Sequence, residues 1–253
     1  MDDLLHNALE TYTNHIQLLL ISSISFVIAV FIPLFAAFPT YTDIGGIYIR
    51  TASVFTNLNI LDTAVIVASI FFSLLFLSFA MVAVNIVVKH SRTYAKIRQE
   101  VFRGLEKYTS RVFVVLLMME AVIVLADVLS FVVTGSATVS GIITALAGLV
   151  MAPFFFYAPA SIIIDENRTL RAMSASFRFF FKRFDYFLLW LAVAIILTTA
   201  LDFIFIAMGS ALPGGYAYAA FIVELIVDTV FLLPFLIVLQ SESYMKRFAM
   251  LKH

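Results

Sequence analysis

The chain has 253 residues, 63% of them hydrophobic and 13% charged, and its mean hydropathy is +1.06. A soluble domain is about 45–50% apolar, so this composition indicates a membrane protein that spans the bilayer several times. The 16 basic and 16 acidic residues balance, which argues against a nucleic-acid partner. The absence of cysteine excludes a disulfide framework, a thiol nucleophile, a thiolate zinc site and an iron–sulfur cluster.

The first ten residues do not form a signal peptide, because they carry three acids and no lysine or arginine. Leu4, Leu5, Ala8 and Leu9 recur at helical spacing, which predicts a short helix lying in the membrane interface. Six later stretches are apolar over the ~20 residues that a helix needs to cross the hydrocarbon core. We expect spans at residues 16–38, 63–88, 112–134, 142–164, 187–208 and 219–239.

The cations give the orientation. All but Arg50 of the 16 lysines and arginines lie between spans two and three, between spans four and five, or after span six. The positive-inside rule places these segments, and therefore both termini, in the cytoplasm. We predict an all-α polytopic bundle of six transmembrane helices in the plasma membrane. Residues 1–253 would form a single membrane domain, with two interfacial amphipathic helices on the cytoplasmic side.

The two basic segments between spans resemble each other at an offset of 76 residues, and a further 76 residues leads to the end of span six. Ile86 thereby matches Ile162, and Val238 falls under Ile162 in the third copy. This spacing indicates three helical hairpins, each of which enters the cytoplasm through an apolar span and leaves along a basic interfacial helix. Such helices either contact anionic lipid or serve only as topological signals, and both interpretations stay open. The candidate lipid contacts are Arg92, Lys96, Arg103, Lys107, Arg168, Arg171, Arg178 and Lys182.

The end of span four and the residues after it carry a recognisable pattern. Ala158-Pro159-Ala160 leads through Ile164-Asp165-Glu166 to Ala172-Met173-Ser174-Ala175-Ser176-Phe177, and span six ends in Tyr244-Met245-Lys246-Arg247. This pattern resembles the six-helix membrane domain attached to some glycerophosphodiester phosphodiesterases and the stand-alone relatives of that domain. The resemblance covers the C-terminal half and implies a fold and a membrane location. It does not imply phosphodiesterase activity, because no segment here matches the soluble catalytic barrel.

Acidic residues inside the spans are the most informative feature. A carboxylate at the centre of a lipid-facing helix costs roughly 2.5–3.5 kcal/mol, so such groups usually face the bundle or water. Helical rise places four acids, from three helices, in the outer half of the bilayer. We therefore predict an acidic cavity near the outer surface. Its candidate residues are Asp127, Asp202, Glu224 and Asp228, with Glu120 deeper in span three and Asp62 at the outer mouth of span two.

Two chemical outcomes are open for these acids. They either hold protons and hydrogen-bond one another or the backbone, or they bind a cation such as Ca²⁺, Mg²⁺, Mn²⁺ or Na⁺. Alternatively, protonated acids simply hold helices together. The prolines inside the spans free backbone carbonyls that could line a cavity, although ordinary kinking is the favoured interpretation.

Catalytic signatures are missing from the sequence. All four histidines lie outside the spans, and neither H-E-x-x-H nor G-x-S-x-G occurs. We expect a non-enzymatic protein without a cofactor that moves or shelters a cation, small molecule or lipid through the acidic cavity. The alternative is a scaffold that binds membrane proteins or anionic lipid through its basic helices. Beyond the bilayer itself, a cation, a small molecule and a membrane protein are the candidate partners.

Overall fold

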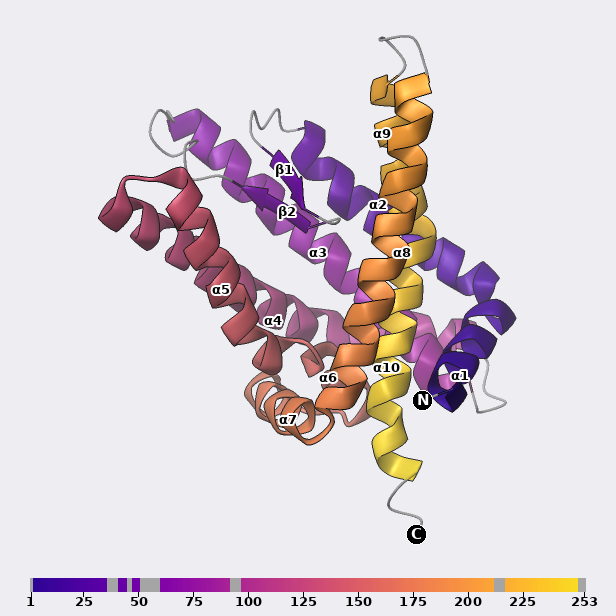
Figure 1. Ribbon diagram of the computed structural model, residues 1–253. Helices are drawn as coiled ribbons and strands as arrows, with labels where there is room; N and C mark the ends of the chain where they lie inside the picture. The colour runs from indigo at the N-terminus through magenta and orange to yellow at the C-terminus, as the bar shows by residue number, and fades with distance from the viewer. Residues whose placement is uncertain are drawn as a thin grey trace.

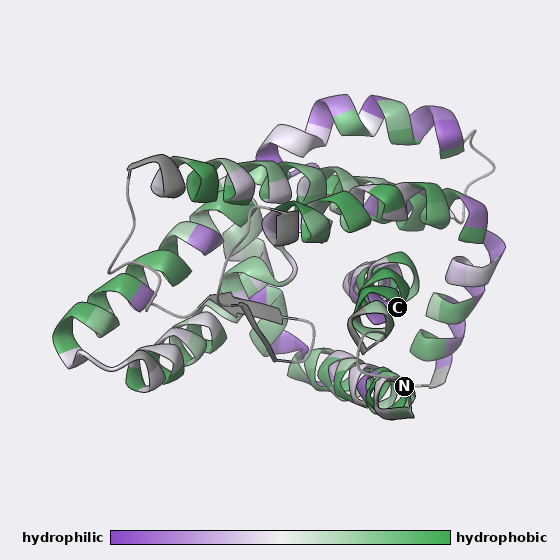
Figure 2. Cartoon of the chain, turned by 90° about the horizontal axis from the view of Figure 1, so that it is seen from above, coloured by the Kyte–Doolittle hydropathy of each residue, from purple (hydrophilic) through white to green (hydrophobic). Residues whose placement is uncertain are grey.

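The computed structural model describes residues 2–35, 41–44, 47–50, 60–91, 97–211 and 217–249. Six helical segments in it are long and apolar enough to cross a membrane, and each contains most of one predicted span. Figure 2 shows that the long helices are hydrophobic along most of their length, with hydrophilic residues gathered in a few shorter stretches. The chain is therefore an all-α bundle of six spans, as the sequence predicts.

The elements follow one another as three helical hairpins with shorter helices between them (Figure 1). The first loop also contains a small antiparallel hairpin, in which Tyr41 pairs with Arg50. The bounds are α1 Asp2–Asn14, α2 Ile16–Phe35, β1 Tyr41–Ile44, β2 Ile47–Arg50, α3 Ile60–His90, α4 Ile97–Thr134, α5 Ala137–Phe155, α6 Ala158–Ile164, α7 Thr169–Lys182, α8 Phe184–Ala211, α9 Ala217–Val227, the π-helix Asp228–Leu232 and α10 Leu233–Ala249.

One expected interfacial helix is not a separate element. Its described part is the beginning of α4, a continuous helix of 38 residues. At 1.5 Å per residue this helix is about 57 Å long, against a hydrocarbon core of about 30 Å. No proline interrupts the join, and the only glycine there, Gly104, packs on Ile86 of α3. The second expected helix is present as α7 and the N-terminal helix as α1, while their position in the membrane interface stays a prediction.

Prolines interrupt several spans, and for Pro33 and Pro234 a hydroxyl of a neighbouring helix pairs the carbonyl that the proline frees. Pro33 cannot donate to the carbonyl of Ala29, which instead accepts from Ser73 Oγ at 2.6 Å. Pro234 likewise leaves the carbonyl of Val230, which accepts from Ser23 Oγ at 2.9 Å. These freed carbonyls therefore join helices together and do not line a cavity, which agrees with the kinking interpretation.

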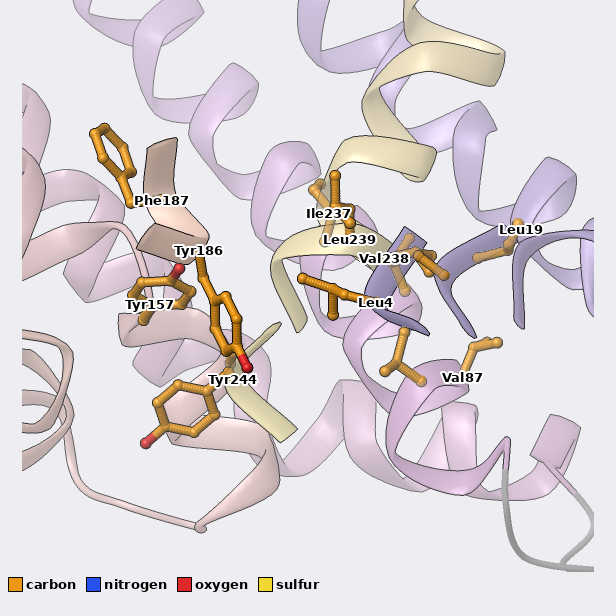
Figure 3. Close-up of a cluster of buried hydrophobic side chains, with 14 of the residues drawn as sticks. Leu4, Leu19, Val87, Tyr157, Tyr186, Phe187, Ile237, Val238, Leu239 and Tyr244 are labelled. Carbon is orange, nitrogen blue, oxygen red and sulfur yellow. The ribbon is translucent and has the colours of Figure 1, made fainter. Parts of the chain in front are cut away.

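The three hairpins meet at one end of the molecule, which carries α1, α6 and α7 and is called the basic end below. There α3, α6 and α10 contact one another, and α1 packs against α10. Val87, Ile162 and Val238, from the three segments of the suspected repeat, are fully buried at this junction. Figure 3 shows Leu4 of α1 beside Val238 and Leu239. The core of the protein thus lies at the basic end.

Candidate functional site

Asp127 is the most buried of the intramembrane acids, with 7% of its surface exposed. It lies on α4 and faces α5 within the same hairpin. Its Oδ1 accepts hydrogen bonds from Ser140 Oγ at 2.9 Å and Thr144 Oγ1 at 3.2 Å. Ser130 and Ser140 share a further hydrogen bond of 2.7 Å. Asp127 therefore joins two consecutive helices, which is the structural role considered for the intramembrane acids.

The acids of the last hairpin belong to another group of helices. Gly209 of α8 lies against Ala220 of α9. Counting two helical turns from this contact places Asp202 at the level of Asp228, where the π-helix begins. Glu224 lies one turn before Asp228 on α9. Asp202, Glu224 and Asp228 thus share one hairpin, and none of them is on an element that packs extensively on α5.

The predicted convergence of acids from three helices is wrong. Asp127 is turned toward α5, whereas the other three outer acids lie in the hairpin of α8 and α9. Within the described part of the chain, no three His, Asp or Glu residues are placed so that they could hold a metal ion. Glu120 lies two helical turns before Asp127 on α4 and is half-buried, and the side chain of Asp62 lies outside the described residues. The reason is topological, because consecutive helices pack together before distant ones.

The basic end brings together charges that the sequence analysis treated separately. Glu166, in the link between α6 and α7, pairs with Lys89 Nζ of α3 at 3.2 Å and with Lys107 Nζ of α4 at 2.6 Å. Lys89 also donates to the carbonyl of Ile163, near the end of α6. The ring of Tyr108 lies beside both lysines, with its centroid 4.9 Å from Lys107 Nζ and 5.9 Å from Lys89 Nζ. We call the four residues around this carboxylate, Lys89, Lys107, Tyr108 and Glu166, the acidic clasp.

The acidic clasp keeps the carboxyl group of Glu166 negatively charged. Hydrogen bonds from Lys107, then from the tyrosine and from Lys89, lower the pKa of the Glu166 carboxyl to about 2. Glu166 also has a φ of 57°, a left-handed conformation that is uncommon for a residue other than glycine. The backbone is therefore held in an unfavourable conformation where the clasp forms. This role of Glu166 was not predicted, although its place directly after a long apolar span is a signal in the sequence.

Two candidate lipid contacts are engaged within the protein. Lys107 belongs to the acidic clasp, and Arg103 lies 3.3 Å from Glu100 on its own helix. Arg92 and Lys96 lie outside the described residues. The remaining four, Arg168, Arg171, Arg178 and Lys182, are all exposed at or along α7.

Helix α7 has three faces. One face packs on the bundle through five buried residues, Ala172, Ala175, Ser176, Phe179 and Phe180. The second is apolar and exposed, with Leu170 at 71% and Phe181 at 60% exposure and Phe177 between them. The third carries Arg171, Arg178 and Lys182, about 100° further around the helix. The two exposed faces adjoin, so one side of α7 presents both an apolar and a cationic stripe.

A buried polar layer at the end of span six was not predicted. Ser241 Oγ of α10 donates to Asn85 Oδ1 of α3 at 2.8 Å, and Thr11 Oγ1 of α1 donates to the buried Glu242 at 2.9 Å. Tyr244 donates to Asp165 at 2.6 Å. The polar run after the apolar part of span six was the signal that could have revealed this layer. A polar pocket of about 210 Å³ lies nearby, lined by Asn7, Glu10, Thr11, Asn14, His15 and Ser91.

Comparison with protein-family models, with curated proteins and with solved structures finds no match for this chain. The resemblance to the phosphodiesterase-associated membrane domain therefore stays a prediction. The exposed apolar and cationic stripes of α7 make the basic end the candidate functional site.

Proposed function

We propose that this integral membrane protein binds anionic lipid headgroups with α7, at the cytoplasmic surface of the membrane. The observation that carries the proposal is the arrangement of exposed side chains on α7. An apolar stripe of Leu170, Phe177 and Phe181 adjoins a cationic stripe of Arg171, Arg178 and Lys182. A helix with this division lies in the interface, with its apolar side in the acyl region and its cations at headgroup level.

The energetics favour anionic lipid. Each lysine or arginine near an anionic surface contributes about 1 kcal/mol, so the cationic stripe supplies at most about 3 kcal/mol. The buried face of α7 adds rigidity, because Phe179 and Phe180 hold the helix against the bundle. The cations are thus presented on an already formed helix, and little ordering of the backbone is needed when lipid binds.

This proposal replaces transport through an outer acidic cavity as the preferred function, because Asp127 bonds to α5 and the described residues contain no group of three acids or histidines that could hold a metal ion. It develops the alternative of a scaffold with basic cytoplasmic helices. A membrane-protein partner could bind the same stripe only by displacing lipid from it. We propose the plasma membrane as the location, with both termini in the cytoplasm, since the basic end carries the exposed cations.

The single tryptophan provides the test. Trp190 lies near the start of α8, and it contacts Phe156 at a ring distance of 4.7 Å. The protein is reconstituted in vesicles in which either the anionic or the zwitterionic lipid is brominated, and quenching of Trp190 reports which lipid is enriched nearby. We expect stronger quenching by the anionic lipid. The triple variant Arg171→Gln, Arg178→Gln, Lys182→Gln should lower that preference tenfold or more, as about 1.4 kcal/mol corresponds to tenfold.

A matched control keeps the charges and changes the side chains. The variant Arg171→Lys, Arg178→Lys, Lys182→Arg should retain the preference for anionic lipid. An equal preference for both lipids in the unmodified protein would contradict the proposal, and so would an unchanged preference in the glutamine variant.

A further inference from the structure

The fourth span is broken between α5 and α6, and a side chain of α7 fills the break. Ser176 is fully buried, and its hydroxyl accepts a hydrogen bond from the amide of Tyr157 at 2.9 Å. The same hydroxyl donates to the carbonyl of Pro153 at 2.8 Å. In an unbroken helix, the amide of Tyr157 would bond directly to that carbonyl four residues earlier. Ser176 is therefore inserted into the backbone hydrogen-bond ladder of span four, which is a known cause of helix kinks.

The distortion is concentrated at one residue. Phe156 has ordinary helical angles, with φ −56° and ψ −54°, whereas Tyr157 has φ −93° and ψ 1°. Helical hydrogen bonding resumes with Ser161, whose amide bonds to the carbonyl of Tyr157 at 2.9 Å. A change in ψ at Tyr157 therefore alters the bend between α5 and α6.

Helix α7 also holds the side chain of the residue at the break. The ring of Tyr157 is fully buried and meets the ring of Phe179 edge-on, with centroids 4.8 Å apart. From the other side, the amide of Gln240 donates to the carbonyl of Phe156. Tyr157 therefore contacts α7 through both its backbone amide and its ring, while α10 binds the carbonyl of Phe156.

The Tyr157 amide and the Pro153 carbonyl have two alternative sets of partners. In the structure, the Ser176 hydroxyl pairs with both. When a shift of α7 takes this hydroxyl out of the break, the two groups can bond to each other and the bend becomes smaller. Pro159 at the start of α6 has no amide hydrogen, so span four stays kinked in both arrangements. These two buried groups are paired in either arrangement, which is a requirement for a two-state element in a membrane.

We propose that Ser176 couples α7 to the bend of span four, so that binding of anionic lipid by α7 sets the angle between α5 and α6. This inference rests on the proposed lipid binding. Lipid that engages both exposed stripes of α7 holds the helix in the headgroup plane and keeps Ser176 in the break. Lipid can shift the bend only as far as it binds one arrangement better than the other, and the cationic stripe supplies that difference.

The absence of cysteine allows the bend to be measured directly. Spin labels are attached to Ile142→Cys on α5 and Ile195→Cys on α8, two exposed positions in different hairpins. A change in bend of about 20° acting over the roughly 20 Å from Tyr157 to Ile142 moves the outer end of α5 by about 7 Å. We expect the label distance in anionic vesicles to differ from that in zwitterionic vesicles by about 5 Å or more.

Two variants assign this shift to the hydroxyl. Ser176→Ala removes the inserted group and should abolish the dependence of the label distance on lipid. Ser174→Ala, at an exposed position on the same helix, should behave like the parent protein. A label distance that is the same in both lipids overturns the coupling, and so does a lipid-dependent shift that persists in Ser176→Ala.

Trp190 quenching in the same samples separates this inference from the proposed function. A preference for anionic lipid together with a constant label distance leaves the lipid binding intact and removes only the coupling. Loss of the preference itself removes both. Should Ser176→Ala fail to fold, the parent protein alone still decides, because its label distance either changes with lipid or does not.

Discussion

The basic end and the opposite end of the molecule are held together in different ways. At the basic end, α1, α3, α6 and α10 form a common core in which Val87, Ile162 and Leu239 are fully buried. At the opposite end, Val132 and Val133 of α4 are largely exposed, and Asp127 bonds only within its own hairpin among the contacts described. Figure 1 shows the corresponding arrangement, with α4 and α5 leaning away from α8 and α9.

This difference indicates that the three hairpins pack most closely at the basic end, whereas the far ends of α4 and α5 pack mainly on each other. Hydrogen bonds between hairpins near α7 include those from Ser241 to Asn85 and from Tyr244 to Asp165, and one further along the spans joins Ser23 of α2 to the carbonyl of Val230. In lipid, apolar contact alone adds little between helices, so close packing and polar contacts decide where helices associate. The basic end has both close packing and polar contacts.

The largest expected effect is a contrast between two leucines. Leu239 is fully buried at the basic end, and Leu149 of α5 is 64% exposed. Leu239→Ala should lower the free energy of unfolding by about 2 kcal/mol or more, because it leaves a cavity. Leu149→Ala should change it by less than about 0.5 kcal/mol. Titration with a denaturing detergent in mixed micelles measures both, and equal losses would refute a core confined to the basic end.

Two glycines provide the next contrast. A methyl group at Gly104 would lie 1.9 Å from Cδ1 of Ile86, whereas nothing lies within 4 Å of one at Gly148. Gly148→Ala should stabilise the protein by up to about 1 kcal/mol through helix propensity. Gly104→Ala gains the same propensity but forces Ile86 to move, at a cost of about 1–3 kcal/mol. In the same detergent titration, Gly104→Ala should have a lower free energy of unfolding than Gly148→Ala. The reverse order would show that α3 and α4 are loosely packed.

Asp127 tests the independence of the hairpins. Asp127→Ala should cost about 1 kcal/mol, the usual scale of a hydrogen-bond contact between helices in a membrane. Asp127→Asn keeps an acceptor oxygen for Ser140 and should cost less. When either substitution is combined with Asp202→Asn, the two changes in the free energy of unfolding should add to within about 0.5 kcal/mol. A double-mutant cycle measures this, and a larger coupling energy would restore a shared acidic site.

The smallest effect concerns the acidic clasp and depends on pH. The pKa of Glu166 is lowered from 4.5 to about 2 in the folded protein, so its ion pairs stabilise the fold above about pH 4.5. That contribution should be lost as the pH falls from 4.5 toward 2. Because Glu166 is 49% exposed, the loss should stay below about 1 kcal/mol. Thermal unfolding across this range should show a larger loss in the parent protein than in Glu166→Gln, which keeps the ion pair of Arg183 and Asp185; identical pH profiles would exclude the clasp.

The spans were predictable because each is a continuous apolar run whose signal does not depend on any other part of the chain. The spacing of Arg171, Arg178 and Lys182 predicted the cationic face of α7. The first interfacial helix was mispredicted since charge marks polarity but does not end a helix, and no proline separates it from span three. The shared acidic site failed for another reason, as depth along a helix axis does not fix the direction in which a side chain points.

By itself, the sequence determined six hydrophobic spans, the uneven distribution of cations and the amphipathic character of α7, because these properties follow from local composition and helical period. The tertiary structure alone decided that Glu166 meets Lys89 and Lys107, that Ser176 enters the ladder of span four, and that Asp127 faces Ser140. Each of these contacts depends on how helices rotate and pack against one another, and many different rotations satisfy the same pattern of hydrophobic and polar residues.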